Sequence, residues 1–187
     1  MHRQHPTISM PTTDVLEPPA HMRRVITGHD ASGKSIVLRD ESNPPSIWGP
    51  EETGFRVYDL YRTDETPAQI DEELGAGGWA DRISGNRELV SPNGSTLRVF
   101  DYRPGASVEM HRTPSIDYGI VLKGEVTLVL DGGETVIFKT GDVIIQRGTA
   151  HSWRNDTSGW TRVMFAVLPA QQIIIKGKPL VEQAVNL

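Results

Sequence analysis

Short apolar runs separated by turn residues fill the chain from Ser95 onward. Runs of this length with alternating apolar and polar positions predict β-strands, because successive side chains of a strand point to opposite faces. Eight runs follow one another without a helical segment between them: residues 96–102, 107–111, 116–122, 125–130, 135–138, 142–146, 151–154 and 161–168. Asp131-Gly132-Gly133 has the composition of a hairpin loop between two of them. The series predicts an all-β jelly roll or small barrel over residues 95–170.

The segment before the barrel, residues 23–94, predicts additional N-terminal strands and a covering loop. Residues 24–27 and 35–38 flank a turn-rich stretch and predict a hairpin, and the alternating run 55–61 predicts a further strand. Residues 64–94 carry clustered glycines and predict a loop with room for one helical turn, placed to cover a pocket.

The two ends of the chain predict less regular structure. Residues 1–22 are rich in proline and poor in large hydrophobic side chains, so burial cannot offset their ordering entropy, and we expect a flexible arm. Residues 171–187, with Ile173-Ile174-Ile175 before a glycine, predict a C-terminal strand or tail.

Composition narrows the class of protein. A chain of 187 residues with 37% hydrophobic residues has room for one core, and 18 Gly and 13 Pro favour many turns over a helix bundle. The formal charge of -5 provides no basic surface for a phosphate backbone, so nucleic acid is not an expected partner. No cysteine is present, which excludes disulfides and thiolate sites. Without an apolar run of about 18 residues or a signal-peptide pattern, we expect a cytoplasmic protein with no membrane partner.

Gly28 to Ser35 fits the nucleotide-binding pattern GxxxxGK[ST] letter for letter. In a P-loop, a helix must follow the lysine, because its N-terminal N–H groups and dipole bind the phosphates. Ile36-Val37-Leu38 after Lys34 is strand-like, and Pro44-Pro45 stops any helix after about two turns. We therefore interpret the match as coincidence.

A second sequence pattern contains the candidate catalytic and metal-binding residues. Gly105, His111, Thr113, Asp117 and Gly124 keep every spacing of the motif G(X)5HXH(X)3E(X)6G, with Thr113 in place of its second His and Asp117 in place of its Glu. This stretch resembles the first motif of the cupin family.

Residues 141–155 resemble the second cupin motif, because they keep its Gly, its GxxH and its terminal Asn. The first gap is one residue short, and Gln146 stands where the family has Pro. The resemblance covers residues 105–155, extends by strand count to 96–168, and is to single-domain bacterial and fungal cupins. It implies a double-stranded β-helix, the cupin jelly-roll barrel, here with extra N-terminal strands.

Strand alternation predicts which side chains share the barrel interior. His111 shares a face with Thr113, and His151 shares one with Trp153 and Asn155. The third shared face carries Asp117, Gly119 and Val121.

If the barrel closes, His111, Asp117 and His151 converge as metal ligands, with the Thr113 hydroxyl as a weaker donor. We expect a pocket in which Gly119 leaves space beside Val121, Trp153 forms an apolar wall, and Asn155 also faces inward.

Two imidazoles and one carboxylate suit Fe(II) and also accept Zn or Mn, so a divalent metal is the expected cofactor. A metal-free, hydrogen-bonded pocket is the alternative, because Thr is a poorer ligand than His and Asp is one methylene shorter than Glu. The substrate is expected to be a small molecule.

Because the second His is absent, we expect a metal-dependent lyase or isomerase that decarboxylates or dehydrates an oxygenated organic acid or carbonyl compound. Asp117 would be the third ligand or a general base. The alternatives are an Fe(II)-dependent dioxygenase and a ligand-binding cupin without turnover. Unpaired edge strands, and the tendency of cupins to dimerise, further predict a homodimer.

Overall fold

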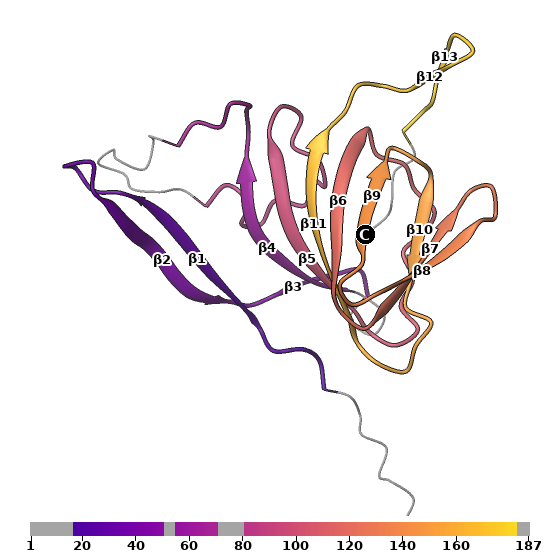
Figure 1. Ribbon diagram of the computed structural model, residues 1–187, viewed down its shortest axis with the longest axis horizontal. Coiled ribbons are helices and arrows are strands. Elements are labelled where there is room, and N and C mark those ends of the chain that lie inside the picture. The colour runs from indigo at the N-terminus through magenta and orange to yellow at the C-terminus, as the bar shows by residue number, and fades with distance from the viewer. Residues whose placement is uncertain (1–16, 51–54, 71–80, 183–187) are drawn as a thin grey trace, which may run out of the picture.

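The computed structural model describes residues 17–50, 55–70 and 81–182, which form strands and loops (Figure 1). None of these residues forms a helix, so the described part contains no helix that could cross a membrane. The strands are β1 (Met22–His29), β2 (Ser35–Asn43), β3 (Ser46–Trp48), β4 (Phe55–Thr63), β5 (Ser95–Tyr102), β6 (Ser115–Lys123), β7 (Glu125–Leu130), β8 (Thr135–Lys139), β9 (Val143–Arg147), β10 (His151–Arg154), β11 (Thr161–Pro169), β12 (Ile174–Ile175) and β13 (Lys178–Pro179).

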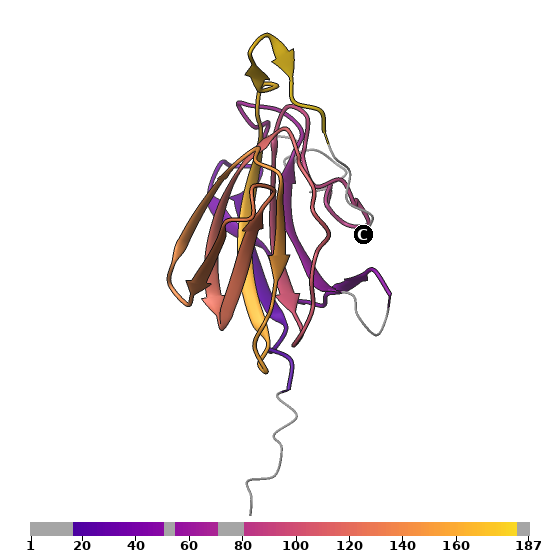
Figure 2. The ribbon, with the colours of Figure 1, turned by 90° about the vertical axis from the view of Figure 1, so that its right-hand side faces the viewer.

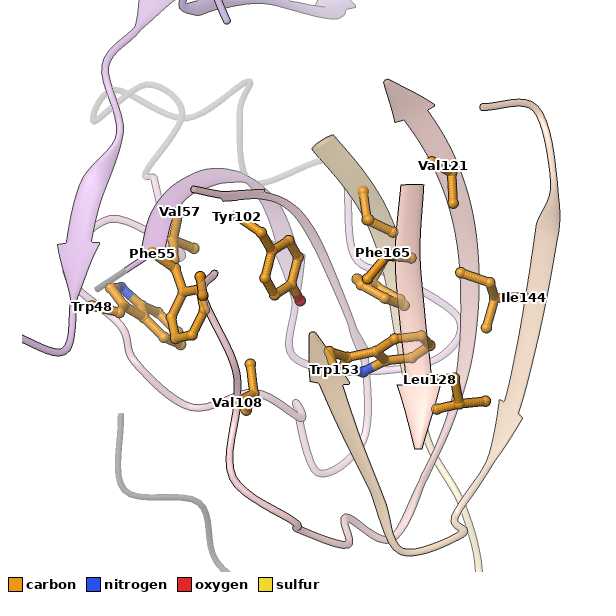
Figure 3. Packing of buried hydrophobic residues seen from close by; sticks show 13 residues of the cluster. Trp48, Phe55, Val57, Tyr102, Val108, Val121, Leu128, Ile144, Trp153 and Phe165 are labelled. Carbon is orange, nitrogen blue, oxygen red and sulfur yellow. The ribbon is translucent and has the colours of Figure 1, made fainter. Parts of the chain in front are cut away.

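Two antiparallel sheets enclose the core. One has six strands in the order β3-β4-β5-β11-β6-β9, and the other has three in the order β10-β7-β8. Ile144 and Phe165 from the first sheet and Leu128 and Trp153 from the second belong to one cluster of buried side chains between the sheets (Figure 3). The fold is therefore the predicted all-β jelly roll, a double-stranded β-helix.

Seven of the eight predicted runs are strands, and the run 107–111 is not. In place of a continuous ladder, the isolated bridges Ser107 to Arg154 and His111 to His151 connect this stretch to β10. Between them, the Ser152 hydroxyl donates to the carbonyl of Val108 at 2.7 Å. The short strand β3 was not predicted, because Pro44-Pro45 directly precedes it.

The β1–β2 hairpin forms a sheet of its own and extends away from the barrel (Figure 1). Its turn explains why the P-loop pattern is not a phosphate site. The carboxylate of Asp30 accepts hydrogen bonds from the backbone N–H of Ser32 at 2.9 Å and of Lys34 at 3.0 Å, so the loop's own side chain occupies these donors. Strand β2 then begins at Ser35, where a P-loop needs a helix.

The loop at residues 81–94 is held against the barrel by Arg98 of β5. Its guanidinium is 2% exposed, pairs with Asp59 at 2.7 Å, and donates to the carbonyls of Glu88 and Asn86, each at 2.6 Å. Leu89 of this loop packs against the core cluster. Leu89 of this loop also lines the cavity inside the barrel. Residues 71–80 of the predicted cover lie outside the described residues.

The two chain ends differ from the predicted boundaries in detail. Residues 1–16 of the predicted arm lie outside the described residues, and Met22 already belongs to β1. The C-terminal segment forms a hairpin of two-residue strands, β12 and β13, instead of one strand. This hairpin, in yellow, projects beyond the barrel (Figure 2).

Candidate active site

A cavity of about 60 Å³ lies inside the barrel. Most of its wall is apolar, and His111, Thr113, Asp117 and His151 supply the polar groups. The apolar lining consists of Phe55, Leu89, Phe100, Tyr102, Val108, Trp153, Phe165 and Val167. Since one water molecule needs about 10–15 Å³ of cavity volume, this cavity has room for a few waters or for the end group of an organic molecule.

The two histidines are placed by a reciprocal backbone bridge. The N–H of His111 donates to the carbonyl of His151 at 2.9 Å, and the N–H of His151 donates back at 2.8 Å. Their ring centroids lie 4.3 Å apart. Burial lowers the pKa of His111, and burial together with the neighbouring His111 lowers the pKa of His151 to about 4. Both imidazoles are therefore neutral at pH 7.

Asp117 points inward from β6 and is 9% exposed. Its Oδ1 atom is buried and has no hydrogen-bond partner among the described residues. Burial raises its pKa to about 6, against the smaller opposing effect of a hydrogen bond from Ser115. An unpaired buried carboxylate is costly, so its presence indicates a group that meets a ligand or a proton.

Thr113 lines the same cavity, as the shared face with His111 predicted. Its hydroxyl lies 2.8 Å from the Ser115 hydroxyl, so the two side chains form a hydrogen bond with each other. Thr113 thus lies beside the histidines but already has a protein partner.

Three predicted pocket residues have other roles. A Cβ on Gly119 would lie 2.7 Å from Cε1 of Phe165, so this glycine accommodates an aromatic ring and leaves no free space. Val121 is 1% exposed and packs in the core cluster instead of lining the cavity. Asn155 is fully buried, and its amide donates to the carbonyls of Tyr102 at 3.0 Å and Gly159 at 2.7 Å, so it fixes loops at the end of β10.

Trp153 does line the cavity, and its ring packs edge-on to His151 with 5.5 Å between centroids. The prediction missed Phe55, Phe100 and Tyr102, which come from strands it had placed correctly. The alternation within 55–61 and 96–102 could have assigned them to the interior.

Gln146 is the polar residue whose role the sequence did not reveal. It stands on β9, is 3% exposed, and its amide nitrogen lies 2.7 Å from Nδ1 of His151. In the sequence, Gln146 is notable only because the cupin motif has proline at this position.

The fit of this site to a divalent metal depends on lone pairs. Asp117 Oδ1 is free to bind, and His111 retains Nε2 because its Nδ1 lies 2.8 Å from the carbonyl of Glu109. The nearest partner of Nδ1 of His151 is an amide group instead of a carbonyl, because this atom lies 2.7 Å from Nε2 of Gln146. Across the described residues, no group of three His, Cys, Asp or Glu side chains is arranged to hold a metal ion. The donor set therefore does not fit a three-ligand metal site as it stands.

Fold and site together define a small jelly-roll protein with a mostly apolar pocket that holds two imidazoles and a carboxylate. The family described as "Cupin domain" matches residues 98–167. The chain is 42% identical over 160 residues to phomopsin biosynthesis cluster protein D of Diaporthe leptostromiformis, an alignment that covers 84% of this chain and 83% of that protein. It is 36% identical over 160 residues to the cupin-domain-containing oxidoreductase virC of Hypocrea virens, covering 81% and 78%.

The chain belongs to the cupin family. Among solved structures, the cupin domain of Schizosaccharomyces pombe Cnp3 matches with a TM-score of 0.48 and 12% identity, covering 79% of this chain and 87% of that one.

Proposed function

We propose that this cupin is a small-molecule enzyme, a lyase or isomerase that moves a proton on an oxygenated organic substrate. The observation that carries the proposal is the buried, unpartnered oxygen of Asp117 in a pocket shared with two neutral imidazoles. A general acid or base works best when its pKa lies near the working pH, and the pKa of Asp117, about 6, meets this condition.

We assign a different role in the reaction to each group of side chains in the pocket. The oxygenated end of the substrate enters the cavity, where the aromatic wall excludes water. Asp117 takes a proton from the carbon next to a carbonyl group, and an imidazole N–H stabilises the oxygen on which negative charge develops. In isomerisation the carboxyl returns the proton to another carbon, and in dehydration it passes the proton to a departing hydroxyl group, which leaves as water.

The relatives support a small-molecule role. The name of the protein from Diaporthe leptostromiformis places it in the biosynthesis cluster for phomopsin. The alignment covers most of both sequences, which supports a comparable biosynthetic role for this chain.

Deuterium exchange tests the proposal. We would incubate the protein in D2O with a panel of small keto and hydroxy acids and follow deuterium incorporation and product formation by NMR. We expect exchange or turnover on at least one compound, lost in Asp117→Asn and retained in the matched control Asp156→Asn, whose carboxylate is exposed at the surface. Binding without exchange would instead identify a cupin without turnover.

The metal-dependent form of this chemistry remains a prediction. Metal analysis of protein purified without an affinity tag tests it, and exchange that survives chelation would show that the proton transfer needs no metal. The proposed proton transfer uses only side chains of this protein.

An oxidoreductase is the second candidate, because virC and further relatives from Aspergillus ruber and Neurospora crassa are named cupin-domain-containing oxidoreductases. Stoichiometric iron together with substrate-dependent oxygen consumption would favour an Fe(II)-dependent dioxygenase and contradict the lyase proposal.

A further inference from the structure

Gln146 reaches the ring of His151 from β9, which belongs to the other sheet of the barrel. Its Oε1 accepts the backbone N–H of Gly148 at 2.9 Å. Its Nε2 lies 2.8 Å from the carbonyl of Thr149 and 2.7 Å from Nδ1 of His151. Every polar atom of this buried amide therefore has a partner.

These contacts determine which terminal atom of the Gln146 amide is the oxygen and which is the nitrogen. Rotating the amide by half a turn would place its NH2 group against the N–H of Gly148 and its oxygen against the carbonyl of Thr149. Both contacts would then pair like with like, donor with donor and acceptor with acceptor. The NH2 group therefore faces Thr149 and His151, and its two shortest contacts are the Thr149 carbonyl and Nδ1 of His151, with the Thr149 hydroxyl farther away at 3.2 Å.

We infer that Gln146 donates a hydrogen bond to Nδ1 of His151 and thereby holds this histidine in the tautomer with its proton on Nε2. A nitrogen–nitrogen separation of 2.7 Å requires a hydrogen between the atoms, and the amide nitrogen can only donate. Nδ1 must then present its lone pair. The carbonyl of Thr149, 3.0 Å from Nδ1, is served by the second amide hydrogen.

The two histidines consequently have opposite tautomers. Nδ1 of His111 lies 2.8 Å from the carbonyl of Glu109, which can only accept, so Nδ1 carries the proton and Nε2 keeps its lone pair. The pocket thus contains one imidazole nitrogen that accepts and one that donates, on rings whose centroids lie 4.3 Å apart.

This pairing deepens the proposed function and rests on it for its catalytic meaning. His151 is the N–H donor that stabilises a developing oxyanion, and Gln146 is a positioning residue that acts through it. The same tautomer disfavours a metal at His151, since its Nε2 must lose the proton before it can bind one.

Nitrogen-15 NMR of the full-length protein labelled in histidine tests the tautomers directly. At pH 7.5 we expect two-bond correlations showing His151 protonated at Nε2 and His111 protonated at Nδ1. In Gln146→Met the amide donor is gone and Thr149 is the remaining partner, so His151 should change to the Nδ1-protonated form while His111 stays as it was. The matched control Gln171→Met, the same change at an exposed glutamine, should leave both signals unchanged.

Titration with Zn²⁺ alone provides a second readout. Gln146→Met gives His151 a free Nε2, so its affinity for Zn²⁺ should rise at least tenfold over that of the unmodified protein. The inference is overturned if the unmodified protein has His151 protonated at Nδ1, or if Gln146→Met leaves its tautomer unchanged. The wild-type spectrum decides the matter even if the variant does not fold. Neither NMR result depends on turnover, so a failure of the proposed function would be seen separately.

Discussion

Replacing Asp117 by Asn should make the protein more stable at neutral pH while it abolishes activity. Burial raises the pKa of Asp117 from 3.8 to about 6, so the folded state holds this proton more tightly than the unfolded chain does. For a group of this kind, stability falls as pH rises from the unfolded pKa to the folded one. Above pH 6 the folded protein therefore bears the full cost of a buried, unpaired carboxylate.

The size of the effect follows from the shift. A shift of about two pKa units at 1.36 kcal/mol each gives about 3 kcal/mol as the cost of the ionised form. The asparagine amide adds buried N–H donors without a matching acceptor. We expect this to offset about 1 kcal/mol of the stabilisation. We expect a net stabilisation of about 2 kcal/mol at pH 7.5, or a rise in Tm of about 4–8 °C for a chain of this length.

The assay compares thermal or urea unfolding of the two proteins between pH 3.5 and 8. His151 contributes in the opposite direction, because its pKa is lowered from 6.5 to about 4 and the folded state resists its protonation as pH falls through that range. The difference between variant and parent isolates Asp117: the variant should be more stable by about 2 kcal/mol above pH 6. Below about pH 3.8, where Asp117 is protonated in both states, only the amide penalty remains, and the variant should be less stable by about 1 kcal/mol. The exposed Asp156→Asn serves as the control and should change stability by less than about 0.5 kcal/mol. A variant less stable than the parent at pH 7.5, or a difference independent of pH, would refute the reasoning.

Three further predictions concern other parts of the chain. Gly119→Ala forces a methyl group against Phe165 and should cost about 1–3 kcal/mol in denaturant unfolding, whereas Gly132→Ala, with no described atom within 4 Å of the added Cβ, should cost nothing measurable. Lys34→Ala should leave ATP binding and any activity unchanged in calorimetry and turnover assays, and saturable ATP binding lost in this variant would show that the loop binds phosphate after all. Light scattering should give about twice the chain mass of 20.7 kDa, because the edge strands of the β1–β2 sheet present unpaired backbone groups that a second copy could cover; a monomer at all concentrations would contradict the homodimer.

Most of the fold could be predicted from the sequence, because alternation and turn residues are local signals. Strands β4 to β11 follow the predicted runs within one or two residues at either end. The stretch 107–111 has the same alternation but forms only isolated bridges and a side-chain hydrogen bond with β10 among the described residues. These contacts join residues about 40 positions apart, and no local pattern contains them.

The part of the site that could be predicted from the sequence is the part encoded in the spacing of the cupin motifs. His111, Asp117 and His151 line one cavity, as their spacing and faces indicated. Gly119 was misjudged because the absence of a side chain was equated with free space, whereas Phe165 from β11 fills that space. Asn155 has the predicted inward face but lies past the end of β10, where its amide binds loop carbonyls instead of facing the cavity.

The three departures from the cupin motif looked independent in the sequence, but in the structure they have a common consequence for the chemistry of the site. Thr113 replaces an imidazole by a hydroxyl that is already bonded to Ser115. Gln146 places an amide donor 2.7 Å from Nδ1 of His151 and so leaves the proton on the nitrogen that a metal would need. Asp117 is shorter than the usual glutamate and keeps an unpaired oxygen with a pKa near 6. Each change removes a lone pair from metal binding or adds a group that exchanges protons near neutral pH. The same barrel positions that could hold a metal are thereby better suited, in this chain, to hydrogen bonding and proton transfer.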